Sequence, residues 1–286
     1  MTPSPDLHSP TSPDSVWAEL AALALSSGRA AAALAASHAR GSLDVTTKTT
    51  STDMVTAADR ASETLIVERL RAARPDDLFL AEEGTGADGL VAGDPGPVAA
   101  AAGPVTWVID PIDGTTNFVY GLPGGAVAIA ARVRDRVVAG VVGDITHGDE
   151  FVATLGGGAT RNGERLRLAD PPPLSRALLA TGFGYDPERR ASQAAALATI
   201  LPRVRDIRRM GAAAVDLCSV ACGRVDAYYE WGLAAWDYSA GALVATEAGA
   251  RVARPDGGPL QPDGRVVAAH PDLWGPLVEL LGEAGA

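Results

Sequence analysis

The sequence predicts an α+β protein in which helices and sheets are layered in two halves. Apolar runs of strand type gather between residues 78 and 154, whereas strand and helix patterns alternate from residue 178 to residue 283. Three consecutive prolines, Pro171–Pro173, stand between these regions as a natural joint. We therefore expect three parts: a disordered tail over 1–14, an N-terminal metal-binding α+β half over 15–170 and a C-terminal α/β half over 171–286.

Composition limits the classes of function. The chain has 286 residues and a hydrophobic fraction of 47%, which is typical of a folded globular protein. Its formal charge of -11 is opposite to the basic surface of a nucleic-acid-binding protein, so we expect no nucleic-acid partner. Two cysteines are too few for a disulfide framework, and the N-terminal residues lack the pattern of a signal peptide. We expect a cytoplasmic protein.

The N-terminal half begins with helical patterns. Val16–Ala39 is rich in Ala and Leu, but charged and polar residues interrupt it too often for a membrane span, so we expect an amphipathic helix and no membrane partner. Thr46–Thr52 is a polar stretch that contains Lys48 and predicts a loop. Asp53–Ala58 leads into a second helix. The apolar face of that helix contains Leu65, Ile66 and Leu70.

Two acidic clusters stand where apolar strands should end. The run Leu78–Ala81 leads into Glu82 and Glu83, and Val105–Ile109 leads into the segment that holds Asp110 and Asp113. Carboxylates brought this close would repel one another unless a cation neutralised them, and oxygen ligands favour magnesium over zinc. The glycine and threonines after Asp113 add small residues and backbone N–H groups suited to an anion beside the metal.

The rest of the N-terminal half predicts an antiparallel sheet. Ala126–Val133 and Val137–Val142 form a plausible hairpin, and Glu150–Thr154 adds a further strand. The Gly-, Ala- and Pro-rich segment Gly84–Pro104 lacks periodicity and predicts a mobile surface loop between the two acidic strands, placed where it could lie over the site.

The C-terminal half alternates between the two periodicities. Strands are expected at Leu178–Thr181, Val204–Arg208, Val225–Glu230 and Arg265–Ala269. Helices are expected at Glu188–Leu201, Ala212–Ala221, Asp237–Ala248 and Asp272–Glu283.

Four motifs resemble, in order, the signatures of the inositol monophosphatase family. They are DMVTAAD (Asp53 to Asp59), FLAEE (Phe79 to Glu83), WVIDPIDGTTNF (Trp107 to Phe118) and AWDYSAGALVATEAG (Ala235 to Gly249). The resemblance implies a fold like that of fructose-1,6-bisphosphatase, with alternating α/β/α/β/α layers and the active site between the halves. It also implies a magnesium-dependent, lithium-sensitive homodimer that hydrolyses small phosphate monoesters.

The same resemblance assigns the metal and catalytic residues. It implies that two or three Mg²⁺ ions are held by the side chains of Glu82, Asp110, Asp113 and Asp237 and by the backbone carbonyl of Ile112. Asp59, Thr115 and Glu82 would be catalytic, because a Thr115 to Asp59 hydrogen bond can relay a proton from the attacking water.

Substrate contacts also follow from the resemblance. The phosphate would lie against Gly114, Thr115 and Lys48, and the polyol against Asp113, Gly211, Ala213 and Glu230. Glu230 is the expected specificity residue, since a carboxylate accepts hydrogen bonds from two neighbouring hydroxyls. The expected substrate is myo-inositol 1-phosphate or a similar polyol phosphate.

Several alternatives stay open at this level. Glu230 can instead pair with Arg224 or Arg208, and Asp237 alone suits an ordinary helix N-cap. Cys218 and Arg224 have the C-x5-R spacing of cysteine-dependent phosphatases, although Cys218 lies in a helical pattern that makes it a poor nucleophile. Rival functions are histidinol-phosphate phosphatase, fructose-bisphosphatase, 3'-phosphoadenosine phosphate phosphatase and a regulatory role through a protein partner.

Overall fold

A seven-stranded sheet forms the framework of the first half. The computed structural model describes residues 13–38, 45–47, 54–84 and 104–286. The strands of this sheet lie in the order β3-β4-β5-β6-β7-β8-β9. Their bounds are β3 (Leu78–Ala81), β4 (Val105–Asp113), β5 (Ala126–Val133), β6 (Arg136–Asp144), β7 (Glu150–Thr154), β8 (Gly158–Arg161) and β9 (Glu164–Arg165).

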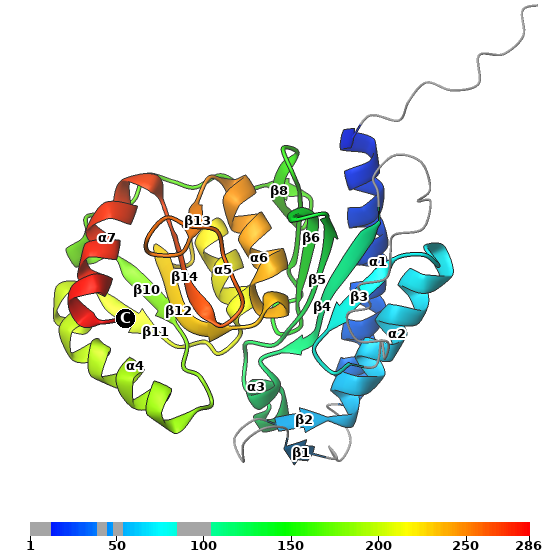
Figure 1. Ribbon diagram of the computed structural model, residues 1–286, viewed down its shortest axis with the longest axis horizontal. Coiled ribbons are helices and arrows are strands. Elements are labelled where there is room, and N and C mark those ends of the chain that lie inside the picture. The colour runs from blue at the N-terminus through cyan, green and yellow to red at the C-terminus, as the bar shows by residue number, and fades with distance from the viewer. Residues whose placement is uncertain (1–12, 39–44, 48–53, 85–103) are drawn as a thin grey trace, which may run out of the picture.

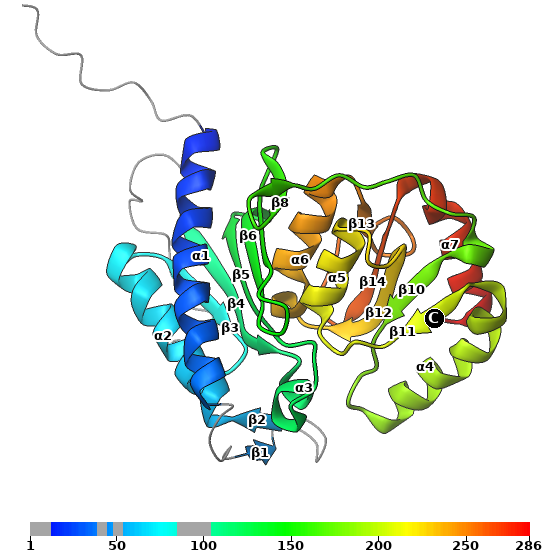
Figure 2. The same ribbon diagram turned by 180° about the vertical axis from the view of Figure 1, so that it is seen from behind.

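Helices cover both faces of this sheet. On one face lie α1 (Pro13–His38) and α2 (Ala57–Ala73), and on the other lie α5 (Ala213–Ala221) and α6 (Ala235–Ala248) (Figures 1 and 2). Alternation along β4 explains this division, because Trp107 and Ile109 pack toward α1 and α2 whereas Val108 packs toward α6. By length and composition α1 would suit a membrane span, yet its residues Leu20, Ala21, Ala24 and Ala31 are buried in the core.

The second half is built on a five-stranded sheet in the order β11-β10-β12-β14-β13. Its strands are β10 (Leu178–Thr181), β11 (Asp206–Arg208), β12 (Ala227–Leu233), β13 (Arg251–Ala253) and β14 (Gly264–Ala269). One face packs on α5 and α6, and the other packs on α4 (Pro187–Ile200) and α7 (Pro271–Ala284). Figure 1 therefore shows the α/β/α/β/α layering that the family resemblance implied.

The structure corrects three expectations about the N-terminal half. Its sheet is not wholly antiparallel, because β3 and β4 pair in parallel. Strand β4 does not end at Ile109 but continues to Asp113, with an irregular register between Asp110 and Asp113. The polar stretch from Thr46 is not all loop, since β1 (Val45–Thr47) pairs with β2 (Met54–Thr56). Residues 13 and 14 of the expected tail belong instead to α1. The rest of that tail, Lys48 and residues 85–103 of the expected loop lie outside the described residues.

The backbones of β6 in the first half and α6 in the second half are in direct contact. A Cβ atom added at Gly140 of β6 would lie 2.9 Å from the carbonyl oxygen of Ala240 in α6. A real Cβ atom essentially never comes so close to a backbone atom, so only glycine lets α6 lie directly on the seven-stranded sheet.

Candidate active site

Parallel pairing of β3 and β4 brings the two acidic clusters to one edge of the sheet. Glu82 follows β3 directly, and its backbone N–H donates to the carbonyl of Ile109 at 3.2 Å, which extends the pairing by one residue. Asp110 and Asp113 are the first and the last of the final four residues of β4, where the register is irregular. The three acids are thus presented together at the carboxyl ends of two neighbouring strands.

Asp237 joins this edge from the second half of the chain. It is the third residue of α6, not its N-cap, and its Oδ2 accepts a hydrogen bond from Ala234 N at 2.6 Å. Asp113 reaches across in the opposite direction, because its Oδ2 accepts from Ala214 N in the first turn of α5 at 2.7 Å. The site therefore lies between the halves.

The acids raise one another's pKa values. Burial and then the negative charges of Glu82, Asp113 and Asp237 hold the pKa of Asp110 well above its usual range. Burial likewise raises the pKa of Asp113 to about 8, although its hydrogen bond from Ala214 acts in the opposite direction. The pKa of Asp237 is raised by burial, then by Asp113 and Glu82. Four neighbouring carboxylates of this kind ionise together only beside a cation.

The donor chemistry of the cluster fits a hard divalent cation. Asp110, Asp113 and Asp237 each accept a hydrogen bond from a backbone N–H at one carboxylate oxygen, which orients their side chains. Oxygen donors alone suit magnesium or calcium rather than zinc. In the described part of the chain, no three His, Cys, Asp or Glu side chains are already arranged to hold an ion as they stand. The acids must therefore adjust their side chains to coordinate one.

A buried Thr–Asp pair lies beside the acids. Thr115, the first residue of α3 (Thr115–Tyr120), donates from Oγ1 to Asp59 Oδ1 at 3.1 Å and lies 3.1 Å from the carbonyl oxygen of Ile112. The other oxygen of Asp59 accepts from both the N–H and the hydroxyl of Thr56, the N-cap of α2. This capping box fixes Asp59 so that one oxygen faces Thr115.

Gly114 makes the turn between the acids and α3. Its φ of 84° is in the left-handed region, and an added Cβ atom would lie 2.4 Å from the carbonyl oxygen of Gly124. Glycine is therefore required here for both backbone conformation and space.

A cavity of about 440 Å³ opens beside these residues. It is lined by Asp113, Gly114, Gly211, Ala213, Glu230 and Asp237, together with two arginines, Arg189 and Arg209. All of the expected polyol contacts thus face one space. Glu230 accepts a hydrogen bond from the Tyr228 hydroxyl at 2.7 Å, and burial raises its pKa.

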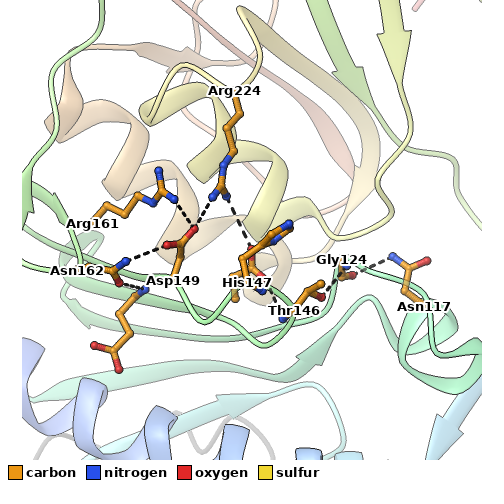
Figure 3. A network of polar contacts seen from close by, with 10 residues as sticks. Asn117, Gly124, Thr146, His147, Asp149, Arg161, Asn162 and Arg224 are labelled. Carbon is orange, nitrogen blue, oxygen red and sulfur yellow. Dashed lines mark hydrogen bonds and ion pairs between the residues drawn. The ribbon is translucent and has the colours of Figure 1, made fainter.

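The structure removes the competing interpretations of Glu230 and Cys218. Arg208 pairs with Asp206, and Arg224 pairs with Asp149 (Figure 3), so both arginines form ion pairs with acids other than Glu230. Cys218 is fully buried in α5, and burial raises the pKa of its thiol well above the usual range. A buried neutral thiol is a poor nucleophile, which excludes the cysteine-dependent phosphatase alternative.

Sequence reasoning missed two buried polar residues near the site. Asp216 lies on α5, neither of its carboxylate oxygens has a hydrogen-bond partner among the described residues, and burial raises its pKa well above the usual range. Asn117 lies on α3 and is 6% exposed. The signal for Asp216 was a lone acid in an otherwise apolar helix, whereas Asn117 was visible only as part of the DGTTNF motif.

Comparison with known proteins shows the family to which the chain is similar. The Inositol monophosphatase family matches residues 16–284. An inositol-1-monophosphatase from Mycobacterium leprae is 47% identical over 248 residues, covering 85% of this chain and 83% of the relative. A Nus factor SuhB from Pasteurella multocida is 42% identical over 236 residues, covering 82% of this chain and 84% of the relative. The solved structure of Mycobacterium tuberculosis SuhB has a TM-score of 0.75 and 39% identity, covering 93% of this chain and 97% of that chain.

The family match extends over both halves and includes every motif that carried the resemblance. The solved structure of the Mycobacterium tuberculosis relative agrees with the layered fold. The chain therefore belongs to the inositol monophosphatase family, which supports a phosphatase activity of the generally metal-dependent kind on a small phosphate ester.

Proposed function

We propose that the protein is a magnesium-dependent phosphomonoesterase that hydrolyses myo-inositol 1-phosphate or a similar polyol phosphate. The observation that carries this proposal is the gathering of Glu82, Asp110, Asp113 and Asp237 at one edge of the sheet, where burial and neighbouring carboxylates raise the pKa values of the three aspartates. A cluster of this kind, at the mouth of a cavity with a further carboxylate in its wall, suits a cation-assisted reaction on a hydroxylated phosphate ester.

Two or three magnesium ions would be held by Glu82, Asp110, Asp113, Asp237 and the carbonyl of Ile112. When bound, they supply positive charge that neutralises these acids and stabilises the phosphoryl oxygens and the leaving alkoxide. The backbone N–H groups of Gly114 and Thr115 would donate to the phosphate. Lys48 remains a further predicted phosphate contact outside the described residues.

The Thr–Asp pair supplies the proton path. Thr115 Oγ1 already donates to Asp59 Oδ1, so its lone pairs are directed away from Asp59 and can accept a proton from the attacking water. The Thr115 proton then passes to Asp59 Oδ1. Glu82 would orient the same water from the end of β3.

The polyol would occupy the cavity wall formed by the second half. Glu230 would accept hydrogen bonds from two vicinal hydroxyls, and the backbone of Gly211 and Ala213 would contact the ring together with Asp113. We further propose a lithium-sensitive, cytoplasmic homodimer, with both cysteines as free thiols, which suits a reducing compartment.

Phosphate release from a panel of substrates tests the proposal. The panel contains myo-inositol 1-phosphate, histidinol phosphate, fructose 1,6-bisphosphate and 3'-phosphoadenosine 5'-phosphate, each with and without magnesium. We expect magnesium-dependent release with preference for the inositol ester, and a loss of at least about 100-fold in Asp113→Asn. Asp256→Asn, which changes an exposed carboxylate paired with Arg254, is the matched control and should keep wild-type turnover. Wild-type turnover by Asp113→Asn would refute the metal assignment.

The relative named as a Nus factor favours one second candidate, a regulatory role through a protein partner. Affinity capture from lysate separates the two functions, because the Asp113→Asn variant should still capture such a partner if binding does not need catalysis.

A further inference from the structure

Three glycine-containing loops meet beside the cavity. Gly114 precedes α3, Gly124 precedes β5, and Gly211 lies between β11 and α5. A Cβ atom added at Gly114 would lie 2.4 Å from the carbonyl oxygen of Gly124 and 3.1 Å from that of Gly211. The three backbones are therefore in direct contact, and the loop expected to bind phosphate lies against the loop expected to bind polyol.

Asn117 holds this junction together. Its Nδ2 donates to the carbonyl oxygen of Gly124 at 2.8 Å and to that of Met210 at 2.6 Å. The amide group has two N–H donors, so both bonds form at once. Asn117 is buried, which makes these bonds costly to lose.

One end of this arrangement is anchored independently. The N–H of Gly124 donates to Thr146 Oγ1 at 2.9 Å, and Thr146 N donates to the buried carboxylate of Asp144 at 2.9 Å. Figure 3 shows these contacts running toward Arg224, with Asn117 at the opposite end. The Gly124 backbone is thus held in place through its N–H. Asn117, which binds the Gly124 carbonyl, therefore holds the Met210 carbonyl at a fixed position relative to Gly124.

We propose that Asn117 is a positioning residue that fixes the polyol-binding loop, Met210–Ala213, against the phosphate-binding loop and so sets selectivity for polyol esters. This inference rests on the proposed phosphatase function. Asn117 is not among the described residues that line the cavity. It acts through the Met210 carbonyl, which precedes both backbone groups, Gly211 and Ala213, that face the cavity.

The physical basis is the relative position of the two loops, because one binds the phosphate and the other binds the polyol of the same substrate. A polyol phosphate must satisfy both loops at once, so a displacement of about 1 Å between them costs up to about 100-fold in rate. An aryl phosphate has no hydroxyls for Glu230 or the 211–213 backbone and depends on the phosphate loop alone. Loss of Asn117 should therefore affect the polyol ester far more than the aryl ester.

The test compares kcat and KM for myo-inositol 1-phosphate and para-nitrophenyl phosphate in wild type, Asn117→Ala and Asn117→Asp. The aspartate variant keeps the volume but directs a carboxylate at two carbonyl oxygens, so it should separate the loops even where the alanine variant collapses. We expect kcat/KM to fall about 10- to 100-fold on the inositol ester and less than about 3-fold on the aryl ester in both variants.

Asn162→Ala is the matched control. Asn162 also makes two hydrogen bonds, from Nδ2 to Asp149 and from Glu150 N to Oδ1, but it lies on the β8–β9 turn, and the cavity wall does not include it. It should lower the melting temperature without changing the ratio of the two substrates.

Two failures are distinguishable. If a soluble Asn117 variant keeps the wild-type ratio of kcat/KM between the inositol ester and the aryl ester, the proposed role of Asn117 is overturned while the wild-type activity stands. If wild type hydrolyses neither ester, the proposed function itself fails. If only one Asn117 variant is soluble, its ratio alone decides.

Discussion

The hydroxyl of Thr115 donates to the carboxylate of Asp59 across 3.1 Å, although the two residues are 56 positions apart in the chain. Thr115 begins α3, and Asp59 belongs to the first turn of α2. The contact joins a loop that follows the acidic strand to a helix that covers the sheet. Since both residues are buried, a proton passed between them is shielded from bulk water.

Removal of this hydroxyl should affect the reaction far more than the fold. Thr115→Val keeps the shape of the side chain but cannot donate to Asp59, so we expect kcat to fall about 10²- to 10⁴-fold. The free energy of unfolding should fall by only about 1 kcal/mol, as for one lost hydrogen bond. Steady-state kinetics and urea unfolding measure the two effects. Thr115→Ser restores the donor and should recover most of the rate; a serine variant as slow as the valine variant would contradict the relay.

Magnesium should stabilise the protein more at high pH than at low pH. The folded-state pKa of Asp113 is about 8, above the usual 3.8. In metal-free protein its contribution to stability is therefore complete below about pH 3.8 and is lost as the pH rises through about 8. Bound cations remove the repulsion, so the rise in melting temperature on adding magnesium should be larger at pH 8 than at pH 6. At 100 times the dissociation constant the gain is about 2.7 kcal/mol.

Potassium chloride at equal ionic strength is the control for this measurement. A rise of the same size in potassium, or a magnesium effect independent of pH, would argue against a cation site at these acids.

Tyr228 should tune the specificity carboxylate. The hydrogen bond from its hydroxyl lowers the pKa of Glu230, against the larger effect of burial. Tyr228→Phe removes that bond, so the acid limb of the pH profile should move to higher pH for the inositol ester. Loss of a hydrogen bond of about 0.5–1.5 kcal/mol corresponds to about a 2- to 10-fold rise in KM.

The comparison substrate is an aryl phosphate without hydroxyls. Its profile should be unchanged in Tyr228→Phe and in Glu230→Gln; matching shifts on both substrates would show that Glu230 does not contact the polyol.

The Asp149 carboxylate should stabilise the folded protein only at pH values above its folded-state pKa. Burial acts to raise its pKa, but hydrogen bonds from Arg161, Arg224 and Asn162 outweigh burial and lower the pKa to about 2 (Figure 3). Its contribution is therefore present above about pH 3.8 and lost as the pH falls through about 2. Asp149→Asn should cost about 1.5–3 kcal/mol in urea unfolding at pH 7. The difference in the free energy of unfolding between Asp149→Asn and wild type should become smaller below pH 4.

Asp206→Asn, which removes an exposed pair with Arg208, is the control and should change stability by less than about 1 kcal/mol. A pH-independent cost of Asp149→Asn would contradict the ion-pair explanation.

Local patterns predicted most elements within one or two residues. β10, β14 and α7 agree closely with the expected ranges, because their apolar periodicity coincides with their real burial. Strand β4 was ended too early, at Ile109, because the acidic segment after it has no strand periodicity, whereas the structure continues the pairing to Asp113 in an irregular register.

Contacts between distant residues left no local signal. The Met210 carbonyl that Asn117 binds lies 93 positions away, so neither motif alone indicates the bond. The parallel pairing of β3 with β4 also depends on the rest of the sheet. For the site, the acidic edge could be predicted from residues, whereas individual roles came from the family resemblance.

The position of α6 limits how the gene can be divided. Every strand of the seven-stranded sheet precedes residue 166, yet α6, which covers one face of it, begins at Ala235. A fragment cut at the proline joint would leave that apolar face bare to water, where it would self-associate. Two fragments produced by dividing the chain at this joint would therefore have to be expressed together, since each fragment covers the apolar surface that the other exposes.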